Sequence, residues 1–125
     1  MKRALFLDRD GVINYDYGYV HKTEDFHFVD GIFDLVSKAL SVNFEIIIVT
    51  NQAGIAYGYY SEKDFLKLTT WMKSRFSDRG LTIHEVYCCP YHENALVDRY
   101  RKRSFDRKPL PGMILKAARL HSFDL

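Results

Sequence analysis

The chain has 125 residues and a net charge of +2, a length that suits one domain and a charge too small to favour a polyanionic partner such as nucleic acid. Charged residues make up 27% and hydrophobic residues 47%, which excludes a disordered chain and a membrane protein. No apolar run approaches the roughly 20 residues that span a bilayer, and no signal-peptide-like segment opens the chain. Cys88 and Cys89 are neighbours that rarely bridge each other, so reduced thiols and a cytoplasmic location are expected.

Hydrophobic patterns predict strands and helices in turn along the chain. Continuous apolar runs are typical of strands covered on both faces, and apolar residues three and four apart predict helices. Ser61 and Asp64 resemble the capping box that starts a helix. In chain order the expected elements are a strand at 4–7, a helix at 32–40, a strand at 44–50, a helix through 65–76, a strand at 81–88 and a helix at 112–121.

This order of elements is typical of an α/β fold with a parallel sheet and right-handed crossovers. Ligands of such folds bind beyond the carboxyl ends of the strands. Functional residues are therefore expected at Asp8–Asp10, at Thr50–Gln52 and in the loop after Cys88. The chain stops directly after the helix at 112–121, where a doubly wound sheet would continue with another strand.

Two carboxylates follow the first strand in the sequence "DRDG". Side chains of a strand alternate between its faces, so Asp8 and Asp10 can point to the same side, and Gly11 allows a sharp turn. Such a pair can supply a nucleophile and a proton donor, and its hard oxygen atoms suit Mg²⁺. The competing interpretation is a solvated turn, because Asp and Gly are common turn residues.

Two further motifs strengthen the first interpretation. Thr50 and Asn51 end the second predicted strand, where a hydroxyl and an amide could hold phosphate oxygens. Lys108 precedes a helix started by proline, where its ammonium group could neutralise a phosphoryl group. Each motif is weak alone, but three of them at the ends of strands and helices form a specific signal.

The motifs together resemble those of the haloacid-dehalogenase (HAD) superfamily, and within it the heptose-1,7-bisphosphate 7-phosphatases and the histidinol-phosphate phosphatases. The matching segments are "FLDRDGVIN", "GYV" at 18–20, "VTNQAGIA", "GYYSEKDFLKLTTWM" and "RKPLPGM". The resemblance covers essentially the whole chain. It implies a Rossmann-like HAD fold with a parallel sheet, in one domain over residues 1–125 and without a cap domain.

The resemblance also implies roles for the acidic residues. Asp8 would be the nucleophile that forms an aspartyl-phosphate, and Asp10 would protonate the leaving oxygen and then activate water. Mg²⁺ would bind the carboxylate of Asp8 and the backbone carbonyl of Asp10.

The remaining site residues would handle the phosphoryl group and the sugar. Thr50 and Asn51 would hold the transferring phosphoryl group, Lys108 would offset its charge, and Arg107 would contact the rest of the sugar phosphate. Tyr15, Tyr17 and Tyr19 follow the "DRDG" turn and could line the substrate pocket.

The chain departs from the family at the structural zinc site. Relatives often hold zinc with a Cys-x-His and a Cys-x-Cys pair, but here only Cys89 matches, and Tyr91, Ser104 and Asp106 stand at the other three positions. No zinc is therefore expected, and 92–105 is expected to be a mobile loop. One alternative stays open, a rearranged site with these ligands: Cys88, Cys89, His92 and Asp106.

The second departure is the superfamily's fourth motif, an acidic Gly-Asp segment after a further strand, which does not occur in the chain. Relative to the family the chain is truncated at its C-terminus and lacks the last strand–helix units. Asp124 is not assumed to substitute, so Mg²⁺ would be held weakly. The first strand would keep an exposed edge that favours self-association. A fragment of a longer protein is the favoured explanation over a truncated gene product.

The expected function is an Mg²⁺-dependent phosphatase that hydrolyses a small sugar phosphate, heptose 1,7-bisphosphate above all, in the carbohydrate metabolism that serves lipopolysaccharide synthesis. One alternative within the class is a histidinol-phosphate or other small-ester phosphatase. Another is a catalytically silent fragment that serves only in binding or assembly. A nucleic-acid binder that uses the basic run Arg99–Arg103 ranks last, because such a run is more often a solvated loop.

Overall fold

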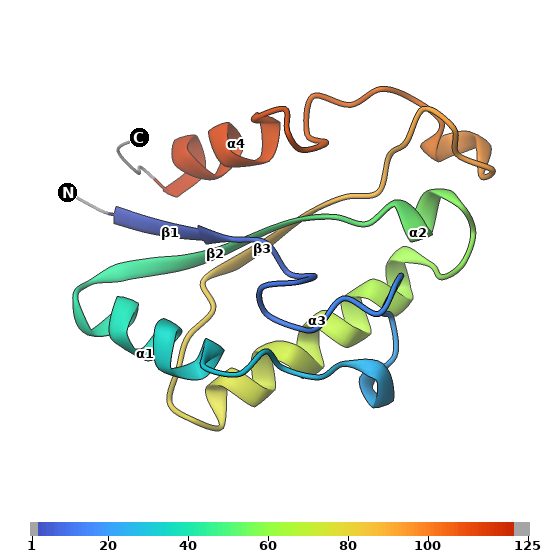
Figure 1. Ribbon diagram of the computed structural model, residues 1–125. Coiled ribbons are helices and arrows are strands. Elements are labelled where there is room, and N and C mark those ends of the chain that lie inside the picture. Colours follow the sequence, from blue (N-terminus) through green and yellow to red (C-terminus); the bar gives the residue numbers. More distant parts are fainter. Residues whose placement is uncertain (1–2, 122–125) are drawn as a thin grey trace.

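Three parallel strands form the sheet in the computed structural model, which describes residues 3–121 (Figure 1). Their order across the sheet is β1-β2-β3, and the register pairs Leu7 with Ile48 and Asn51 with Cys89. The carboxyl ends of all three strands therefore lie at one edge of the sheet. The bounds of the strands are β1 (Arg3–Leu7), β2 (Phe44–Asn51) and β3 (Glu85–Cys89).

Helices cover both faces of this sheet, with α1 and α3 on one face and α4 on the other (Figure 1). The predicted α/β fold with a parallel sheet is confirmed. Within residues 3–121 no helix combines the length and the apolar character that a membrane span needs. The helices are α1 (Ile32–Ser41), α2 (Ala53–Ala56), α3 (Glu62–Ser77) and α4 (Gly112–His121), with short 3-10 helices at Thr23–Asp25 and Asp98–Tyr100.

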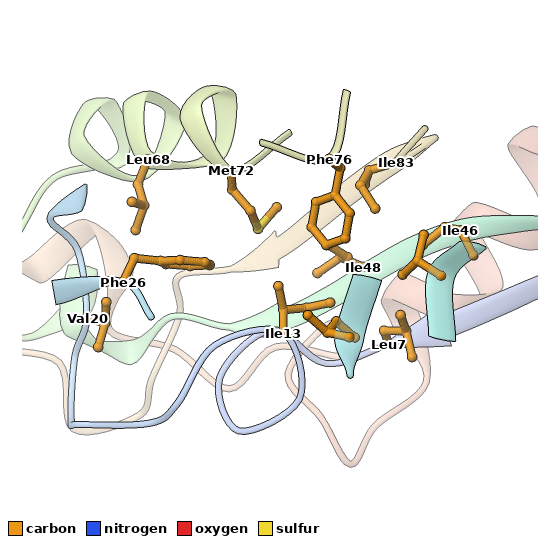
Figure 2. Packing of buried hydrophobic residues seen from close by; sticks show 12 residues of the cluster. Leu7, Ile13, Val20, Phe26, Ile46, Ile48, Leu68, Met72, Phe76 and Ile83 are labelled. Atoms are coloured by element: carbon orange, nitrogen blue, oxygen red, sulfur yellow. The ribbon is translucent and has the colours of Figure 1, made fainter. Parts of the chain in front are cut away.

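The central strand β2 shows why its sequence is apolar without a break. Ile46 and Ile48 point to the core under α1 and α3, while Ile47 and Val49 point to the core under α4. Both sets are buried, as the alternation of a strand between two helical layers requires. Figure 2 shows the first core, where Met72 and other α3 side chains point at the sheet.

The start of α3 follows the predicted capping box. Ser61 Oγ accepts a hydrogen bond from the backbone N–H of Asp64 at 3.1 Å, and Asp64 Oδ2 accepts the N–H of Ser61 at 3.0 Å. These two bonds satisfy N–H groups that a helix start leaves unpaired. They also lower the pKa of Asp64, with the backbone bond from Ser61 as the largest cause.

The third strand differs from its prediction. It was expected at 81–88, but β3 begins only at Glu85 and runs to Cys89. His84 explains the late start. Its ring atom Nδ1 accepts the backbone N–H of Ile46 at 2.9 Å, and the backbone N–H of His84 donates to the Ile46 carbonyl. A side chain thus takes the place of one backbone acceptor, and the regular ladder begins after it.

Candidate active site

Asp8 lies directly after β1, anchored by the buried Leu7 before it. Its Oδ1 accepts the backbone N–H of Arg9 at 2.8 Å, and its Oδ2 stands 2.9 Å from Lys108 Nζ. The Asp8 side chain is 44% exposed, so its carboxylate keeps free lone pairs toward solvent. Asp8 is therefore an anion at a strand tip with a cation beside it and room for a reactant in front.

Asp10 is held more tightly than Asp8. Its Oδ1 accepts three hydrogen bonds, from Arg9 Nε at 3.1 Å, Arg9 Nη2 at 2.8 Å and Asn14 Nδ2 at 3.0 Å. Its Oδ2 accepts one, from Gln52 Nε2 at 3.0 Å. The orientation of this carboxylate is thus fixed by side chains on both sides.

The turn after β1 brings Asp10 back toward the strand tip. Gly11 has a φ of +89°, a left-handed conformation that a side chain would strain. The carbonyl of Arg9 accepts the N–H groups of Val12, Ile13 and Asn14, at 3.2, 2.7 and 3.3 Å, and so closes the turn. The "DRDG" sequence is therefore a hydrogen-bonded turn rather than a solvated one.

Arg9 is the buried support of this turn. Its side chain is 1% exposed, and its guanidinium lies 5.8 Å from the ring centre of Phe26 and 5.9 Å from that of Phe65. Arg9 Nη2 also donates to the Val20 carbonyl at 2.8 Å. A buried guanidinium requires a carboxylate partner, so this pair makes the position of Asp10 a condition of stable folding.

Asn51 connects the end of β2 to the lysine segment. Its Nδ2 donates to the Lys108 carbonyl at 3.1 Å, and its Oδ1 accepts the Lys108 N–H at 3.0 Å. Because the amide of Asn51 bonds to both the N–H and the carbonyl of Lys108, the backbone of Lys108 is fixed relative to β2. This clamp directs the ammonium group to Asp8.

A cavity of about 410 Å³ opens beside these groups. Arg107 lies on its wall and also on the wall of a second cavity of about 220 Å³, where Lys102, Arg103 and Lys108 add positive charge. The basic residues outnumber Glu93 on the wall of the second cavity, so anionic groups are favoured there. The residues that line the first cavity are Asp10, Asp16, Gly18, Tyr19, Asn51, Gln52, Ala53, Tyr60 and Arg107.

No protein-family model matches the chain, but individual relatives do. It is 55% identical, over 98% of its length and 64% of the relative's, to a D-glycero-alpha-D-manno-heptose-1,7-bisphosphate 7-phosphatase of Burkholderia mallei. It is 43% identical, over 99% of its length and 67% of the relative's, to the beta-anomer enzyme of Vibrio cholerae. The chain belongs to the heptose-1,7-bisphosphate 7-phosphatase family.

Solved structures agree with this membership. A protein of Mesorhizobium loti described as a HAD-like phosphatase superposes with a TM-score of 0.92 at 30% identity, over 98% of this chain and 59% of the other. The D,D-heptose 1,7-bisphosphate phosphatase of B. bronchiseptica, complexed with magnesium and phosphate, gives 0.84 at 26% identity, over 100% and 66%. The fold is HAD-like, and the chain spans about two thirds of the length of its curated relatives.

The structure brings the six sequence-predicted site residues to one edge of the sheet. Of the three tyrosines expected at the pocket, Tyr19 lines the cavity, whereas Tyr15 and Tyr17 lie outside its wall. Gln52 and Tyr60 also line it, but the sequence offered no sign of their bond to each other. The six residues are Asp8, Asp10, Thr50, Asn51, Arg107 and Lys108.

The donor set at the tip of β1 fits Mg²⁺, the ion in the structure of the B. bronchiseptica phosphatase. Asp8 is half-exposed, and each of its oxygen atoms has one recorded N–H partner among the described residues. Over residues 3–121 no three or more His, Cys, Asp or Glu side chains gather as a metal site. Mg²⁺ commonly binds one or two protein carboxylates and otherwise keeps water and substrate phosphate as ligands, so a small donor set suits it. Asp124 lies outside the described residues.

The residues that stand at the family's zinc positions do not fit zinc. Cys89 is fully buried in the apolar core under α4, and its neighbour Cys88 has a pKa that burial raises to about 12. Structural zinc is held by four cysteine or histidine ligands, and only Cys89 among these positions is one. The rearranged set of Cys88, Cys89, His92 and Asp106 is likewise not gathered as a metal site in the described part of the chain.

Contacts within the protein fasten the segment 92–105, which corrects the expectation that nothing holds it. The N–H groups of Leu96 and Val97 both donate to the Ala56 carbonyl at 3.0 Å. The buried Tyr100 donates its hydroxyl to Glu62 Oε2 at 2.9 Å. Backbone bonds and a buried tyrosine thus tie this loop to α2 and α3.

Proposed function

We propose that the chain carries the phosphoryl-transfer site of an Mg²⁺-dependent phosphatase that acts on a small sugar phosphate, in particular a heptose 1,7-bisphosphate. The contact of 2.9 Å between Asp8 Oδ2 and Lys108 Nζ carries the proposal. It combines a half-exposed carboxylate nucleophile with a cation that can balance the charge of a phosphoryl group. Phosphoryl transfer depends mostly on such positioning and charge neutralisation.

In the first step a carboxylate oxygen of Asp8 attacks phosphorus, and the bond from phosphorus to the sugar oxygen breaks. Asp10 gives its proton to that oxygen, so the sugar leaves as a neutral alcohol and an aspartyl-phosphate remains. In the second step Asp10, now a carboxylate, takes a proton from water as the water oxygen attacks phosphorus. The bond between phosphorus and Asp8 breaks, which regenerates the carboxylate and releases phosphate.

Other groups orient the phosphoryl group during both steps. Lys108 binds its oxygen atoms and keeps Asp8 in place, while Thr50 and Asn51 stand at the tip of β2 on the same edge. Asp8 and the carbonyl of Asp10 would hold Mg²⁺. Bound there, the cation would supply positive charge against the negative charge that accumulates on the phosphoryl oxygens.

The basic cavity of about 220 Å³ supports the proposal of a substrate with two phosphates. Arg107 borders both cavities, so it can contact a second anionic group while the first one reacts at Asp8. Lys102 adds charge to the same wall. The relatives named above are heptose-1,7-bisphosphate phosphatases, and this agrees with a bisphosphate rather than a simple monoester.

The test is phosphate release from a panel of esters with and without Mg²⁺, including heptose 1,7-bisphosphate, sugar monophosphates and histidinol phosphate. Release should depend on Mg²⁺ and be fastest with the heptose bisphosphate. Asp8→Asn should abolish it, because an amide is a poor nucleophile. Asp98→Asn is the matched control, since Asp98 is an exposed carboxylate of the surface loop that pairs with Arg101.

A preference for histidinol phosphate would move the chain to the sister group. Absence of release from every ester, in the presence of Mg²⁺, would contradict the proposed activity and leave a binding or assembly role.

Two smaller parts of the proposal concern the cellular location of the protein and its self-association. A cytoplasmic location agrees with the free thiols of Cys88 and Cys89. Self-association would use β1, which has β2 as its one partner in the described sheet and lies beside an apolar recess that includes Leu5 and Val42. Sedimentation equilibrium tests this part, and a monomer at high protein concentration would contradict it.

A further inference from the structure

The two oxygen atoms of Asp10 have different surroundings. Oδ1 accepts three N–H groups, from Arg9 and Asn14, and these donors use the space around it. Within residues 3–121, Oδ2 accepts a single N–H, from Gln52, and keeps a lone pair free. A proton on Asp10 would therefore sit on Oδ2.

Gln52 links this oxygen to the second strand tip. Its side chain is buried, with 2% exposure, and Nε2 donates one hydrogen to Asp10 Oδ2 at 3.0 Å and the other to Thr50 Oγ1 at 2.8 Å. Thr50 is fully buried, and its own hydroxyl hydrogen has only a long contact of 3.4 Å with the Asn51 carbonyl. This contact is weak, so the bond from Gln52 is the main polar contact that holds the Thr50 hydroxyl among the described residues.

Tyr60 fixes which way round the Gln52 amide lies. Its hydroxyl donates to Gln52 Oε1, so Nε2 must face Asp10 and Thr50. The Tyr60 ring is buried and stacks on His21, with ring centres 4.8 Å apart and an interplanar angle of 9°. Burial raises the pKa of Tyr60, so the hydroxyl remains a donor over the whole neutral range.

Gly54 leaves the space that the Tyr60 ring needs. A Cβ built on Gly54 would stand 2.8 Å from Tyr60 Cζ, closer than real Cβ contacts come. The ring is therefore enclosed between the backbone of α2 and His21. Packing thus holds the Tyr60 hydroxyl in place, and with it the start of the hydrogen-bond chain that runs through Gln52 to Asp10.

We propose that Gln52 and Tyr60 are positioning residues for general acid catalysis: they hold Asp10 so that Oδ2 delivers the proton to the leaving oxygen. The same amide fixes the Thr50 hydroxyl at the tip of β2. This inference rests on the proposed function. As the ester bond breaks, the proton passes from Oδ2 to the sugar oxygen and Asp10 becomes a carboxylate, which later takes a proton from the attacking water.

The inference predicts a dependence on the leaving group. A sugar alkoxide is a poor leaving group and needs the proton from Asp10, whereas p-nitrophenolate leaves without one. The ratio kcat/KM reports the steps up to the departure of the leaving group. Loss of positioning should therefore lower kcat/KM for the sugar ester much more than for p-nitrophenyl phosphate.

Tyr60→Phe is the first variant, because it removes one hydroxyl and keeps the ring. Its kcat/KM for the sugar ester should fall by roughly 10-fold to 100-fold, within the range that general acid catalysis contributes, and the loss with p-nitrophenyl phosphate should be several-fold smaller. Tyr87→Phe is the matched control, since it also removes a tyrosine hydroxyl with a side-chain partner, His121, but on the α4 side of the sheet and away from the site. It should leave both ratios unchanged.

Gln52→Glu is the second variant. It keeps the size of the side chain but replaces the Nε2 donor by an oxygen that repels Asp10, so its loss with the sugar ester should exceed that of Tyr60→Phe. Equal losses with both esters in an active protein would overturn the inference and leave the proposed function intact. A wild-type chain without Mg²⁺-dependent release from any ester would overturn the proposed function itself, and the inference with it.

If the Gln52→Glu protein fails to fold, NMR spectroscopy of the other proteins still tests the inference without a measurement of turnover. In the wild type the Gln52 side-chain amide should give two distinct, slowly exchanging proton resonances in a ¹⁵N correlation spectrum. Those resonances should broaden or exchange rapidly in Tyr60→Phe and stay unchanged in Tyr87→Phe. Unchanged resonances in Tyr60→Phe would show that the tyrosine does not orient the amide, which overturns the inference.

Discussion

The β1–β2 side of the cavity and the loop side at residues 90–108 hold their functional groups by different kinds of contact. On the β1–β2 side the polar groups are themselves buried and bond one another. Arg9 and Gln52 are 1% and 2% exposed, and both bond to Asp10. Removal of one member would leave another polar group buried without its partner, which is costly.

On the loop side the ion pairs lie in solvent. Arg103 and Glu93, 2.8 Å apart, have side chains 88% and 52% exposed, and such pairs contribute little to stability. Backbone bonds to Ala56 and the buried Tyr100 hold this loop instead. The difference indicates that the carboxylates stand on a rigid frame, while the cationic groups Arg107 and Lys108 come from a segment that depends on a few contacts.

The Asn51 clamp joins the two sides, so its loss should have the largest effect. Asn51→Ala removes both hydrogen bonds to the Lys108 backbone and frees the ammonium group from its position at Asp8. Because a displacement of about 1 Å can cost roughly 100-fold in rate, phosphate release should fall by about that factor. Steady-state kinetics measures it, with Asn94→Ala on the loop surface as the control. Equal rates in the two variants would mean that the loop positions Lys108 without β2.

The Tyr100 contact is the next test of the loop side. Tyr100→Phe removes the bond to Glu62 and should lower the free energy of unfolding by about 1 kcal/mol, a typical net value for one hydrogen bond. Denaturant unfolding measures the loss, and limited proteolysis should cut faster between 92 and 105. A variant as resistant as the wild type would assign the fastening of the loop to its backbone bonds alone.

The pH dependence of stability above pH 9 tests whether the loop covers Cys88 on β3. Cys88 packs against the cluster that contains Tyr100 and Ala95, and burial raises its pKa from 9.0 to about 12. The folded state thus binds the thiol proton more tightly than the unfolded state. Its contribution is complete below pH 9 and is lost as pH rises toward 12.

Stability should therefore fall on the order of 1 kcal/mol for each pH unit above 9, and Cys88→Ala should flatten that fall. Thermal unfolding from pH 8 to 11 measures the slope. An identical slope in wild type and Cys88→Ala would show that the thiol is open to solvent and the loop does not cover it.

The Glu93 ion pair should have the smallest effect. Arg103 lowers the pKa of Glu93, chiefly through their hydrogen bond, yet both side chains lie in solvent. Glu93→Gln should therefore leave the unfolding midpoint unchanged at physiological ionic strength. A clear shift of the midpoint would contradict the view that the loop is held by its buried contacts.

Local sequence signals predicted most of the fold. The capping box at Ser61 and the apolar run of β2 each act over a few residues, so their structures follow from the letters alone. The third strand was predicted to begin at residue 81, four residues too early. The side chain of His84, instead of a backbone carbonyl, accepts the N–H of Ile46, and this contact spans 38 residues. The short helix α2 was not predicted, since a single turn carries no periodicity.

The site was predicted in part for the same reason. Asp8, Asp10 and Lys108 stand at strand and helix ends, which the pattern locates. The clamp between Asn51 and Lys108 spans 57 residues, and the bond between Gln52 and Asp10 spans 42, so neither has a local sign. Gln52 lies in the range 50–52 that the sequence singled out, but its bonds to Asp10 and Tyr60 depend on packing and emerged only from the structure.

The central claim, that Asp8 is the nucleophile, has a direct chemical test. Wild-type protein is mixed with substrate and Mg²⁺, quenched in acid within one turnover, and treated with borohydride, which reduces an aspartyl-phosphate to homoserine. Peptide sequencing should find homoserine at position 8, only with Mg²⁺ and substrate present. Phosphate release with Asp8 unmodified, or with homoserine at position 10 instead, would contradict the account.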